Sequence, residues 1–312
     1  MTKNRYFRFS NYLKKRFGCR VYRVPLDAGF TCPTRDGTLS RGGCLYCDSR
    51  GSASAMIDRR LPVREQLLRG IETMRRRYGA EKFIAYFQAF TNTYAPPAKL
   101  ERLYLEGTSH KDVVGLAVGT RPDCVPEEIL DLIASYTGHY DTWLEYGLQS
   151  AHDSTLKLIN RGHTVSQFSN AVERTKRRGI KVCVHVIIGL PGETSKMIMD
   201  TARFVGSHAA DAVKIHLLHV LKGSRFEQTY RQGELKILSR DEYVSLVCDF
   251  LELLPASVLI QRLTGEAPRG NHVAPQWALD KNAVLRAINA ELEHRDSWQG
   301  KRLSAERPGL KG

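Results

Sequence analysis

The stretch VYRVPLDAGFTCPTRDGTLSRGGCLYCDS, residues 21–49, joins a short apolar strand pattern to a glycine-rich, basic loop. Three cysteines lie in that loop: Cys32, Cys44 and Cys47. Thiolates are soft metal ligands, and glycine allows the backbone to curl tightly around a metal site. The stretch therefore predicts a strand that ends in a metal-binding loop.

The number of cysteines in the loop distinguishes between kinds of metal site. A structural zinc ion and a ferredoxin-type cluster each take four protein ligands. The loop has three cysteines, and the next histidine along the chain is His110. A [4Fe-4S] cluster on three cysteines keeps one iron free for a ligand that is not protein. We therefore predict a [4Fe-4S] cluster with Cys32, Cys44 and Cys47 as its metal ligands.

Two other interpretations of these cysteines stay open. Cys19, which precedes the strand, would complete a four-cysteine site for zinc or for electron transfer. Free cysteines that pack as small hydrophobic residues are the second alternative, and we expect that role for Cys124, Cys183 and Cys248. A secreted disulfide scaffold is disfavoured, because the total of seven cysteines is odd and a chain of 312 residues needs no covalent staples.

Composition places the chain among ordinary soluble proteins. The sequence is 42% hydrophobic and 26% charged, no apolar run approaches the length of a membrane span, and the N-terminus lacks the apolar core of a secretion signal. We expect a cytoplasmic protein. Its 47 Lys and Arg against 33 Asp and Glu leave a net charge of +14, which favours a polyanionic partner or simply a basic solvated surface.

Residues 1–20 predict a short basic helix with aromatic rings between its charges. Rings and cations in this arrangement can stack on bases and hold phosphates. The alternative is a helix that packs through its rings and leaves its charges in water.

Strands and amphipathic helices alternate from residue 21 to residue 222. The predicted strands are 21–26, 82–90, 113–120, 142–150, 180–189 and 212–221, and the predicted helices between them are 61–79, 100–107, 127–138, 166–179 and 196–209. Buried strands that alternate with helices form a parallel sheet with right-handed crossovers. Six units are too few for a closed eight-fold barrel. We expect an α/β fold, an open partial (β/α)6 TIM-like barrel over 21–222.

Three further segments complete the expected organisation. They are the basic N-terminal helix over 1–20, a small C-terminal α+β cap over 223–295, and a basic flexible tail over 296–312.

In parallel α/β folds the loops after the strand C-termini form the site. That rule places the cysteine loop and most of the unusual polar residues of the chain at one rim. The candidates for cofactor binding at this rim are Gln88, Asn92, Thr120, Arg121, Gln149, Ser150, His185 and, in a glycine-rich turn, Gly189 and Gly192. His216 and His219 lie along the sixth strand and face either the core or a substrate.

Six segments, in this order along the chain, resemble the radical S-adenosylmethionine (SAM) superfamily. They are DAGFTCPTRDGT with RGGCLYC, YFQAFTNTYAP, GTRPDC, LEYGLQSAHDSTLKLINRGHT, HVIIGLPGET and KIHLLHVLKGS. Within the superfamily, with its MiaB/NifB-type core, the chain is similar to the group named for YhcC, which is related to the Elongator catalytic subunit and to oxygen-independent coproporphyrinogen oxidase. The resemblance covers residues 5–290.

This resemblance implies that the open iron of the [4Fe-4S] cluster binds SAM, and that reductive cleavage of SAM produces a 5′-deoxyadenosyl radical that abstracts hydrogen from the substrate. The sequence differs from the usual motifs of the superfamily at two places. The usual CxxxCxxC spacing is replaced by a long gap between Cys32 and Cys44. The Gly-Gly-Glu signature after the second strand is replaced by YFQAFTNT, which leaves Gln88 and Asn92 as candidates for binding the amino group of SAM.

Position within the matched motifs implies further SAM contacts. Gln149 and Arg161 resemble a pair that contacts the ribose and the carboxylate, and His185 stands where relatives have a ribose-binding aspartate. The alternatives are a surface ion pair for Arg161 and a satisfied core histidine for His185.

The kinship with Elongator and the basic charge imply a radical SAM enzyme that modifies RNA, in the sharpest version a tRNA wobble uridine. The expected partners are tRNA and an electron donor such as flavodoxin or ferredoxin, with no membrane. One alternative is a radical SAM enzyme that acts on a small anionic metabolite or a tetrapyrrole. The other is a non-catalytic four-cysteine metal protein that binds RNA.

Overall fold

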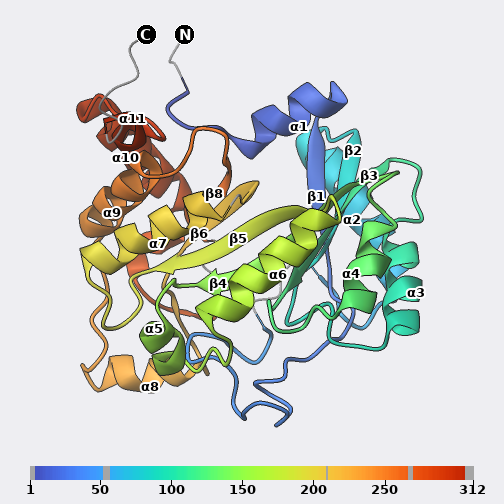
Figure 1. The fold of residues 1–312 in the computed structure, drawn as a ribbon, viewed down its shortest axis with the longest axis horizontal. Helices are drawn as coiled ribbons and strands as arrows, with labels where there is room; N and C mark the ends of the chain where they lie inside the picture. The colour runs from blue at the N-terminus through green and yellow to red at the C-terminus, as the bar shows by residue number, and fades with distance from the viewer. Residues whose placement is uncertain (1–3, 52–56, 209, 266–269, 306–312) are drawn as a thin grey trace.

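Seven parallel strands form one curled sheet in the order β1-β2-β3-β4-β5-β6-β8 (Figure 1). The structure is a computed structural model that describes residues 4–51, 57–208, 210–265 and 270–305. The strands are β1 (Val21–Leu26), β2 (Lys82–Phe87), β3 (Val113–Thr120), β4 (Asp141–Gln149), β5 (Lys181–Ile188), β6 (Ala212–Leu217) and β8 (Leu259–Arg262). The predicted open α/β half-barrel is confirmed, and its sheet has one strand more than the six predicted units.

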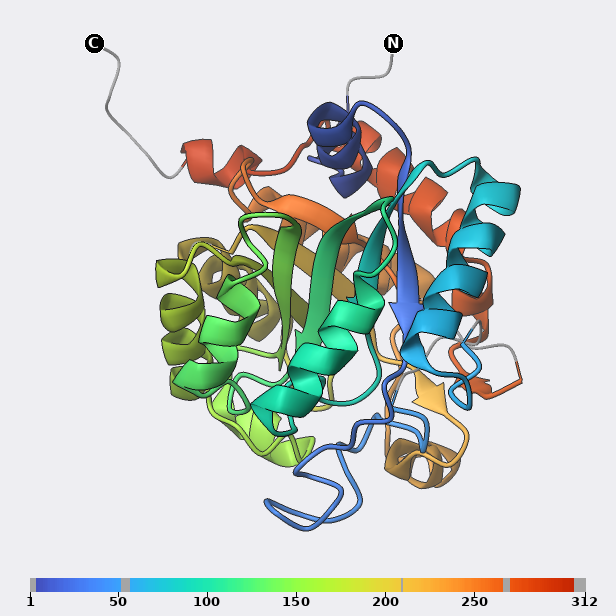
Figure 2. The ribbon, with the colours of Figure 1, turned by 90° about the vertical axis from the view of Figure 1, so that its right-hand side faces the viewer.

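Helices cover the outer face of the curled sheet (Figures 1 and 2). They are α2 (Val63–Tyr78), α3 (Pro97–Gly107), α4 (Glu127–Ala134), α6 (Val165–Arg177), α7 (Ser195–Ser207) and α9 (Arg240–Glu252). Their apolar faces and the outward-facing strand residues form the main hydrophobic core. Both α6 and α9 begin with a capping box, Thr164 with Gln167 and Ser239 with Glu242, which satisfies the first backbone N–H groups of each helix. Among the described residues, no helix combines the length and the hydropathy that crossing a bilayer requires.

Helix α1 (Phe9–Phe17) closes the end of the half-barrel at which the strands begin (Figure 2). Its Phe9 and Tyr12 rings pack edge-on against Trp143 of β4, with ring centroids 5.5 and 6.1 Å apart. The segment before the helix pairs with β8, since the Ile260 N–H donates to the Phe7 carbonyl at 2.8 Å. The rings of α1 therefore pack into the barrel, as the second interpretation of this helix predicts, and its basic last turn stays in water.

The C-terminal part differs from its prediction. Strand β8 joins the main sheet instead of the cap, and the predicted sixth strand breaks after Leu217. The other elements are α5 (Asp153–Leu158), β7 (Val220–Leu221), α8 (Arg225–Arg231), β9 (His272–Ala274), the 3-10 helix η1 (Gln276–Leu279), α10 (Lys281–His294) and α11 (Lys301–Ala305).

The predicted flexible tail is wrong as far as residue 305. Ser297 and Gln299 are buried; the Ser297 hydroxyl donates to the Glu252 carboxylate at 2.6 Å, and the Gln299 amide donates to the Val258 carbonyl at 2.8 Å. These bonds hold the segment against α9 and the start of β8. The rest of the predicted tail, 306–312, lies outside the described residues.

Candidate active site

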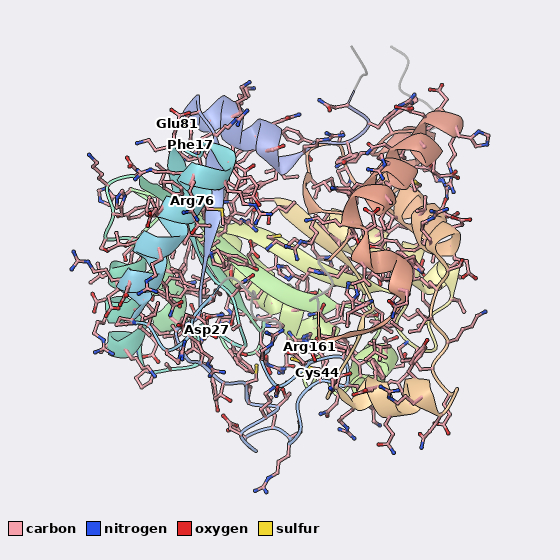
Figure 3. The ribbon with its side chains drawn as sticks, turned by 180° about the vertical axis from the view of Figure 1, so that it is seen from behind. Phe17, Asp27, Cys44, Arg76, Glu81 and Arg161 are labelled. Carbon is pink, nitrogen blue, oxygen red and sulfur yellow. The ribbon has the colours of Figure 1, made fainter. Side chains whose placement is uncertain are left out.

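The three cysteines of the loop after β1 lie together at the C-terminal end of the strands, where Figure 3 shows Cys44 beside Arg161. Cys44 is buried. Burial raises the pKa of both Cys32 and Cys47, and the nearby Cys44 thiol adds to each shift. Among the described residues, the three sulfur atoms do not form a group within 4.8 Å of one another. A single zinc ion holds its sulfur ligands at about 2.3 Å and so draws them closer together than that. The three thiols therefore do not form a preassembled single-ion site among the described residues.

Hydrogen-bond donors and a cation surround these thiols. The Thr91 hydroxyl lies 2.8 Å from the Cys32 sulfur, and the Arg161 guanidinium donates to the Cys44 sulfur at 3.7 Å. Burial raises the pKa of Cys47 to about 11, against the opposing effect of the Arg35 guanidinium. The donors and the cations oppose this effect of burial and would stabilise thiolates that bind iron.

Cys19 lies at the opposite end of the molecule. It follows Phe17 and precedes β1, whereas the loop follows β1, and six residues of strand separate the two ends by about 20 Å. Figure 3 shows Phe17 and Glu81 far from Cys44. The alternative of a fourth cysteine ligand from Cys19 is therefore wrong.

Cys124, in contrast, lies near the site. Burial raises the pKa of its thiol to about 12, and both Asp123 and Cys32 contribute to the shift. The sequence around Cys124 predicts only a packing role, because no metal-binding pattern surrounds this position after β3.

Arg161 connects the cysteine loop to the centre of the sheet. It is buried, and its guanidinium donates twice to the Gly147 carbonyl, at 3.1 and 2.7 Å, as well as to Cys44. The same carbonyl accepts from the His163 imidazole at 3.0 Å. Burial, with Arg161 and Arg121 nearby, lowers the pKa of His163 to about 3, so the ring is neutral and donates through Nε2. The surface ion pair considered for Arg161 is wrong, and His163 is a contact that sequence reasoning missed although it lies two residues further on.

Two neighbouring groups leave no room for a side chain at Gly147. A Cβ there would come within 2.6 Å of both the Arg161 Nη2 and the Gln149 Nε2 atoms. Gln149 itself has a φ of 76° and breaks the register between β4 and β5. The glycine thus lets the Gln149 amide and the Arg161 guanidinium approach each other at the rim.

Two residues in the loop after β2 have positive φ values although neither of them is glycine. Ala89 and Phe90 have φ values of 133° and 60°, a region that costs a residue with a Cβ about 1–3 kcal/mol. The Phe90 ring lies under Arg35, whose guanidinium is 5.3 Å from the ring centroid, and against Gly51, where a Cβ would come within 2.6 Å of the ring. Phe90 thus packs against both Arg35 and Gly51, and these contacts hold the loop after β2 against the cysteine loop.

Several predicted cofactor-binding side chains are bonded within the protein. Arg121 donates to both oxygens of Asp123 and to the Arg161 carbonyl at 2.7 Å. The Thr120 hydroxyl pairs with Thr93 at 2.5 Å.

Two more of these side chains join loops of the rim. The Ser150 hydroxyl donates to the Glu193 carboxylate. The amide of Asn92 donates to the Gly119 carbonyl at 2.8 Å, while its buried oxygen has no partner among the described residues. Hydrogen bonds of this kind favour a positioning role for Asn92, Thr120, Arg121 and Ser150.

Two other predicted side chains form no hydrogen bonds within the described part of the chain, and two predicted glycines shape a turn of the rim. Gln88 and Gln149 make no side-chain hydrogen bond to any described residue. Gly189 and Gly192 have φ values of 94° and 79°, which let the turn between β5 and α7 double back at the rim.

His185 lies below this rim, inside the sheet. Its Nε2 lies 2.9 Å from Glu145, and burial lowers its pKa to about 4. Glu145, Cys183 and His185 form a group of possible metal ligands within 4.8 Å. However, Lys214 and Arg23 both pair with the Glu145 carboxylate. Because two cations already occupy it, the carboxylate is not available to a metal ion, and His185 is a bonded histidine of the barrel interior.

The sequence matches two domain families. Residues 39–205 match the Radical SAM superfamily, and residues 210–294 match the Radical_SAM C-terminal domain. The chain is 42% identical over 300 residues to the protein YtqA of Bacillus subtilis, with 96% of this chain and 93% of that protein covered. It is 31% identical over 169 residues to a tRNA uridine(34) acetyltransferase of Dehalococcoides mccartyi, which covers 52% of this chain and 35% of that enzyme.

Solved structures share the fold. The archaeal Elp3 of Methanocaldococcus infernus superposes with a TM-score of 0.64 at 19% identity, over 89% of this chain and 64% of that chain. Radical SAM enzymes take a [4Fe-4S] cluster and SAM, and the cysteine loop fits such a cluster. The chain belongs to the radical SAM superfamily, and it is a radical SAM enzyme.

Proposed function

We propose that this radical SAM enzyme modifies RNA, and that its substrate is a uridine at the wobble position of tRNA. The observation that carries the proposal is the 31% identity of 169 residues to a tRNA uridine(34) acetyltransferase. The chain covers 35% of that enzyme, so the shared part supports the radical step and not an acetyl transfer. An electron donor such as flavodoxin or ferredoxin, and a cytoplasmic location, go with this proposal.

The surface around the cysteine loop supports a polyanionic substrate. Arg41, Lys222 and Arg225 are exposed there, and none of them has an ion-pair partner among the described residues. Arg225 of α8 lies beside the loop, since a Cβ on Gly42 would be 3.9 Å from its Nη1 atom. We name Arg41, Lys222 and Arg225 the basic rim. Cations that phosphates can reach raise affinity for RNA and make it depend on salt.

Within this proposal, Cys32, Cys44 and Cys47 hold the cluster, which when bound supplies the electron that cleaves SAM. Arg161 fixes Cys44 by its bond to the sulfur and shares its other donors with the Gly147 carbonyl. The amides of Gln88 and Gln149 are the donors left for the polar groups of SAM. The role of the remaining rim residues is to hold the loops in register.

A tRNA-binding measurement across a salt series tests the proposal. Exchange of Arg41 and Arg225 for Gln should weaken tRNA binding about tenfold and reduce the salt slope by about 2. The matched control is Arg76→Gln with Arg77→Gln, which removes the same charge from exposed residues of α2 at the far end, where Figure 3 shows Arg76. Equal losses in both pairs, or wild-type affinity no better than that of an unrelated protein of equal charge, would contradict the proposal.

A second candidate is radical chemistry on a small anionic metabolite or a tetrapyrrole. Positive charge inside the barrel favours it, because Arg23, Lys214 and Arg262 gather there around one carboxylate. An absorption spectrum of ligand that copurifies with the protein distinguishes a tetrapyrrole from RNA.

A further inference from the structure

Inward-facing side chains form successive layers inside the half-barrel, from α1 at one end to the cysteine loop at the other. Alternate residues of β4 point into it: Trp143 packs on α1, Glu145 comes next, and Gly147 lies under Arg161. Steps of two residues along a strand rise about 6.6 Å. On the neighbouring strand His185 is in register with Gly147. Glu145 and His185, whose side chains lie 2.9 Å apart, therefore form a layer next to the Gly147 carbonyl that accepts from Arg161.

This layer carries more positive than negative charge. The Arg23 guanidinium lies 2.8 Å from the Glu145 carboxylate, and Lys214 bonds to the same carboxylate. Burial alone would raise the pKa of Glu145, but Arg23, Lys214 and His185 hold it well below its usual range, so the group is ionised. Arg262 is a further basic residue near the layer. Burial is the main cause that lowers the pKa of His185, Lys214 and His216, and Arg262 adds to each shift. Two guanidinium groups and the Lys214 amine, whose pKa burial lowers to about 7, thus face one carboxylate.

A break in the register of β8 turns Arg262 inward. Lys214 of β6 is paired with Arg262, while the preceding pair is Val213 with Ile260, so Gln261 is an extra residue. Such a bulge lets two successive side chains point to one face. The Gln261 oxygen accepts from Arg23 at 2.6 Å inside the barrel. Arg262 has neither a hydrogen bond nor an ion pair to any carboxylate of the described residues.

Hydrogen-bonding atoms without partners surround Arg262. Within the described part of the chain, the Gln261 Nε2, the His216 Nε2 and both ring nitrogens of His219 are buried and unpaired. The His216 ring lies 5.2 Å from His185, and a Cβ on Gly265 would come within 3.1 Å of His219 and 3.6 Å of His216. Burial lowers the pKa of His219 to about 4, so these rings are neutral and each offers one N–H. Unpaired buried polar atoms cost free energy unless a ligand or water bonds to them.

We propose that this interior is an anion-binding subsite that takes a carboxylate or phosphate group of the substrate, with Arg262 as its cation and Gln261, His216 and His219 as its hydrogen-bond donors. The proposal rests on the function proposed above and deepens it by naming the chemistry of the group that lies below the cysteine loop. A guanidinium with amide and imidazole N–H groups recognises oxyanions.

Titration of the cluster-loaded protein with anions tests the subsite. Sodium phosphate and sodium acetate are titrated separately at fixed ionic strength under anaerobic conditions, and binding is followed by calorimetry. One of the two should bind, and Arg262→Gln should weaken it about tenfold or more, as expected for the loss of a charge-assisted bond. Tighter binding of phosphate assigns a tetrahedral group, and tighter binding of acetate assigns a planar carboxylate.

Controls keep the outcome specific. Arg76→Gln removes one charge from an exposed residue at the far end and should bind the anion as the wild type does. His216→Phe keeps the ring and removes its nitrogens, so it should weaken binding even if Arg262→Gln fails to fold by circular dichroism. Equal affinity in the wild type and both site variants, or no binding of either anion, overturns the subsite.

The same proteins separate this inference from the proposed function. Absence of selective tRNA binding by the wild type, with anion binding intact, refutes the RNA substrate alone. Absence of anion binding by the wild type, with selective tRNA binding intact, refutes the subsite alone.

Discussion

Replacement of the buried carboxylate Glu145 by glutamine should destabilise the protein strongly. The side chain has no exposed surface, and it lies 2.8 Å from the Arg23 guanidinium and 2.9 Å from His185, with Lys214 bonded to it as well. Glu145→Gln keeps the shape of the side chain but leaves two cations without a counter-charge. Removal of one partner from a buried ion pair costs about 3–5 kcal/mol.

The size of this loss converts to a measurable change in melting temperature. The entropy of unfolding is about 2.1 cal/mol/K per residue, which for 312 residues is about 0.66 kcal/mol/K. A loss of about 3–5 kcal/mol then lowers the melting temperature by about 5–8 °C. Differential scanning calorimetry at pH 7.5 measures it. Glu65→Gln, which removes an exposed carboxylate paired with Arg69 on α2, should change stability by about 0.5 kcal/mol or less.

A double-mutant cycle with Lys214→Met shows whether charge is the cause. If the loss arises from an uncompensated cation, Glu145→Gln combined with Lys214→Met should lose less than the sum of the two single variants, by about 0.5–3 kcal/mol. Strict additivity, or a melting temperature for Glu145→Gln equal to that of Glu65→Gln, would refute the reasoning.

Three further measurements test the cysteines, the histidines and the strained loop. Cys44→Ala should lose its iron after anaerobic reconstitution, whereas Cys19→Ala should retain about four irons per chain; retention by the first or loss by the second contradicts the assigned ligands. Burial lowers the pKa of His219 from 6.5 to about 4, so its contribution to stability is complete above pH 6.5 and is lost as the pH falls towards 4. Urea unfolding of His219→Gln should therefore show a shallower acid loss than the wild type, and parallel curves would speak against a buried neutral ring. Ala89→Gly should raise the free energy of unfolding by about 1 kcal/mol by relieving a φ of 133°, whereas Ala85→Gly in β2 should lower it.

The alternation of strands and helices was readable from the sequence because each element carries its own periodicity. The range 113–120 is one run of eight small or apolar residues up to its last threonine, and β3 has those bounds. Strand β8 was assigned to a cap, because its four residues carry a weak pattern and its partner, β6, lies more than 40 residues earlier. The tail was misjudged for a related reason: Ser297 and Gln299 are polar, and only their bonds to distant residues bury them.

Local sequence patterns place residues that follow a strand, but they carry no information on a side chain that makes a distant contact. The resemblance names Arg161 as a SAM contact, whereas its three contacts with Gly147 and Cys44 involve segments 14 and 117 residues away. No local pattern distinguishes such a residue from a surface arginine. Likewise, the inward turn of Arg262 depends on a bulge that exists only when β8 pairs with β6.

Arg23 connects the two edge strands of the half-barrel and also contacts the buried charges inside it. Arg23 on β1 donates to Gln261 on β8, contacts Glu145 on β4, and lies between the Phe9 and Tyr86 rings at 4.9 and 5.0 Å. An open sheet has two edges, and here one guanidinium spans them at the level of the charged layer. Loss of Arg23 should therefore loosen β8 and the subsite around Arg262 together, while the cysteine loop, held from β2 and β4, keeps its own contacts. The interior and the cluster loop are thus stabilised by separate sets of bonds, which allows the anion subsite to be altered without loss of the metal site.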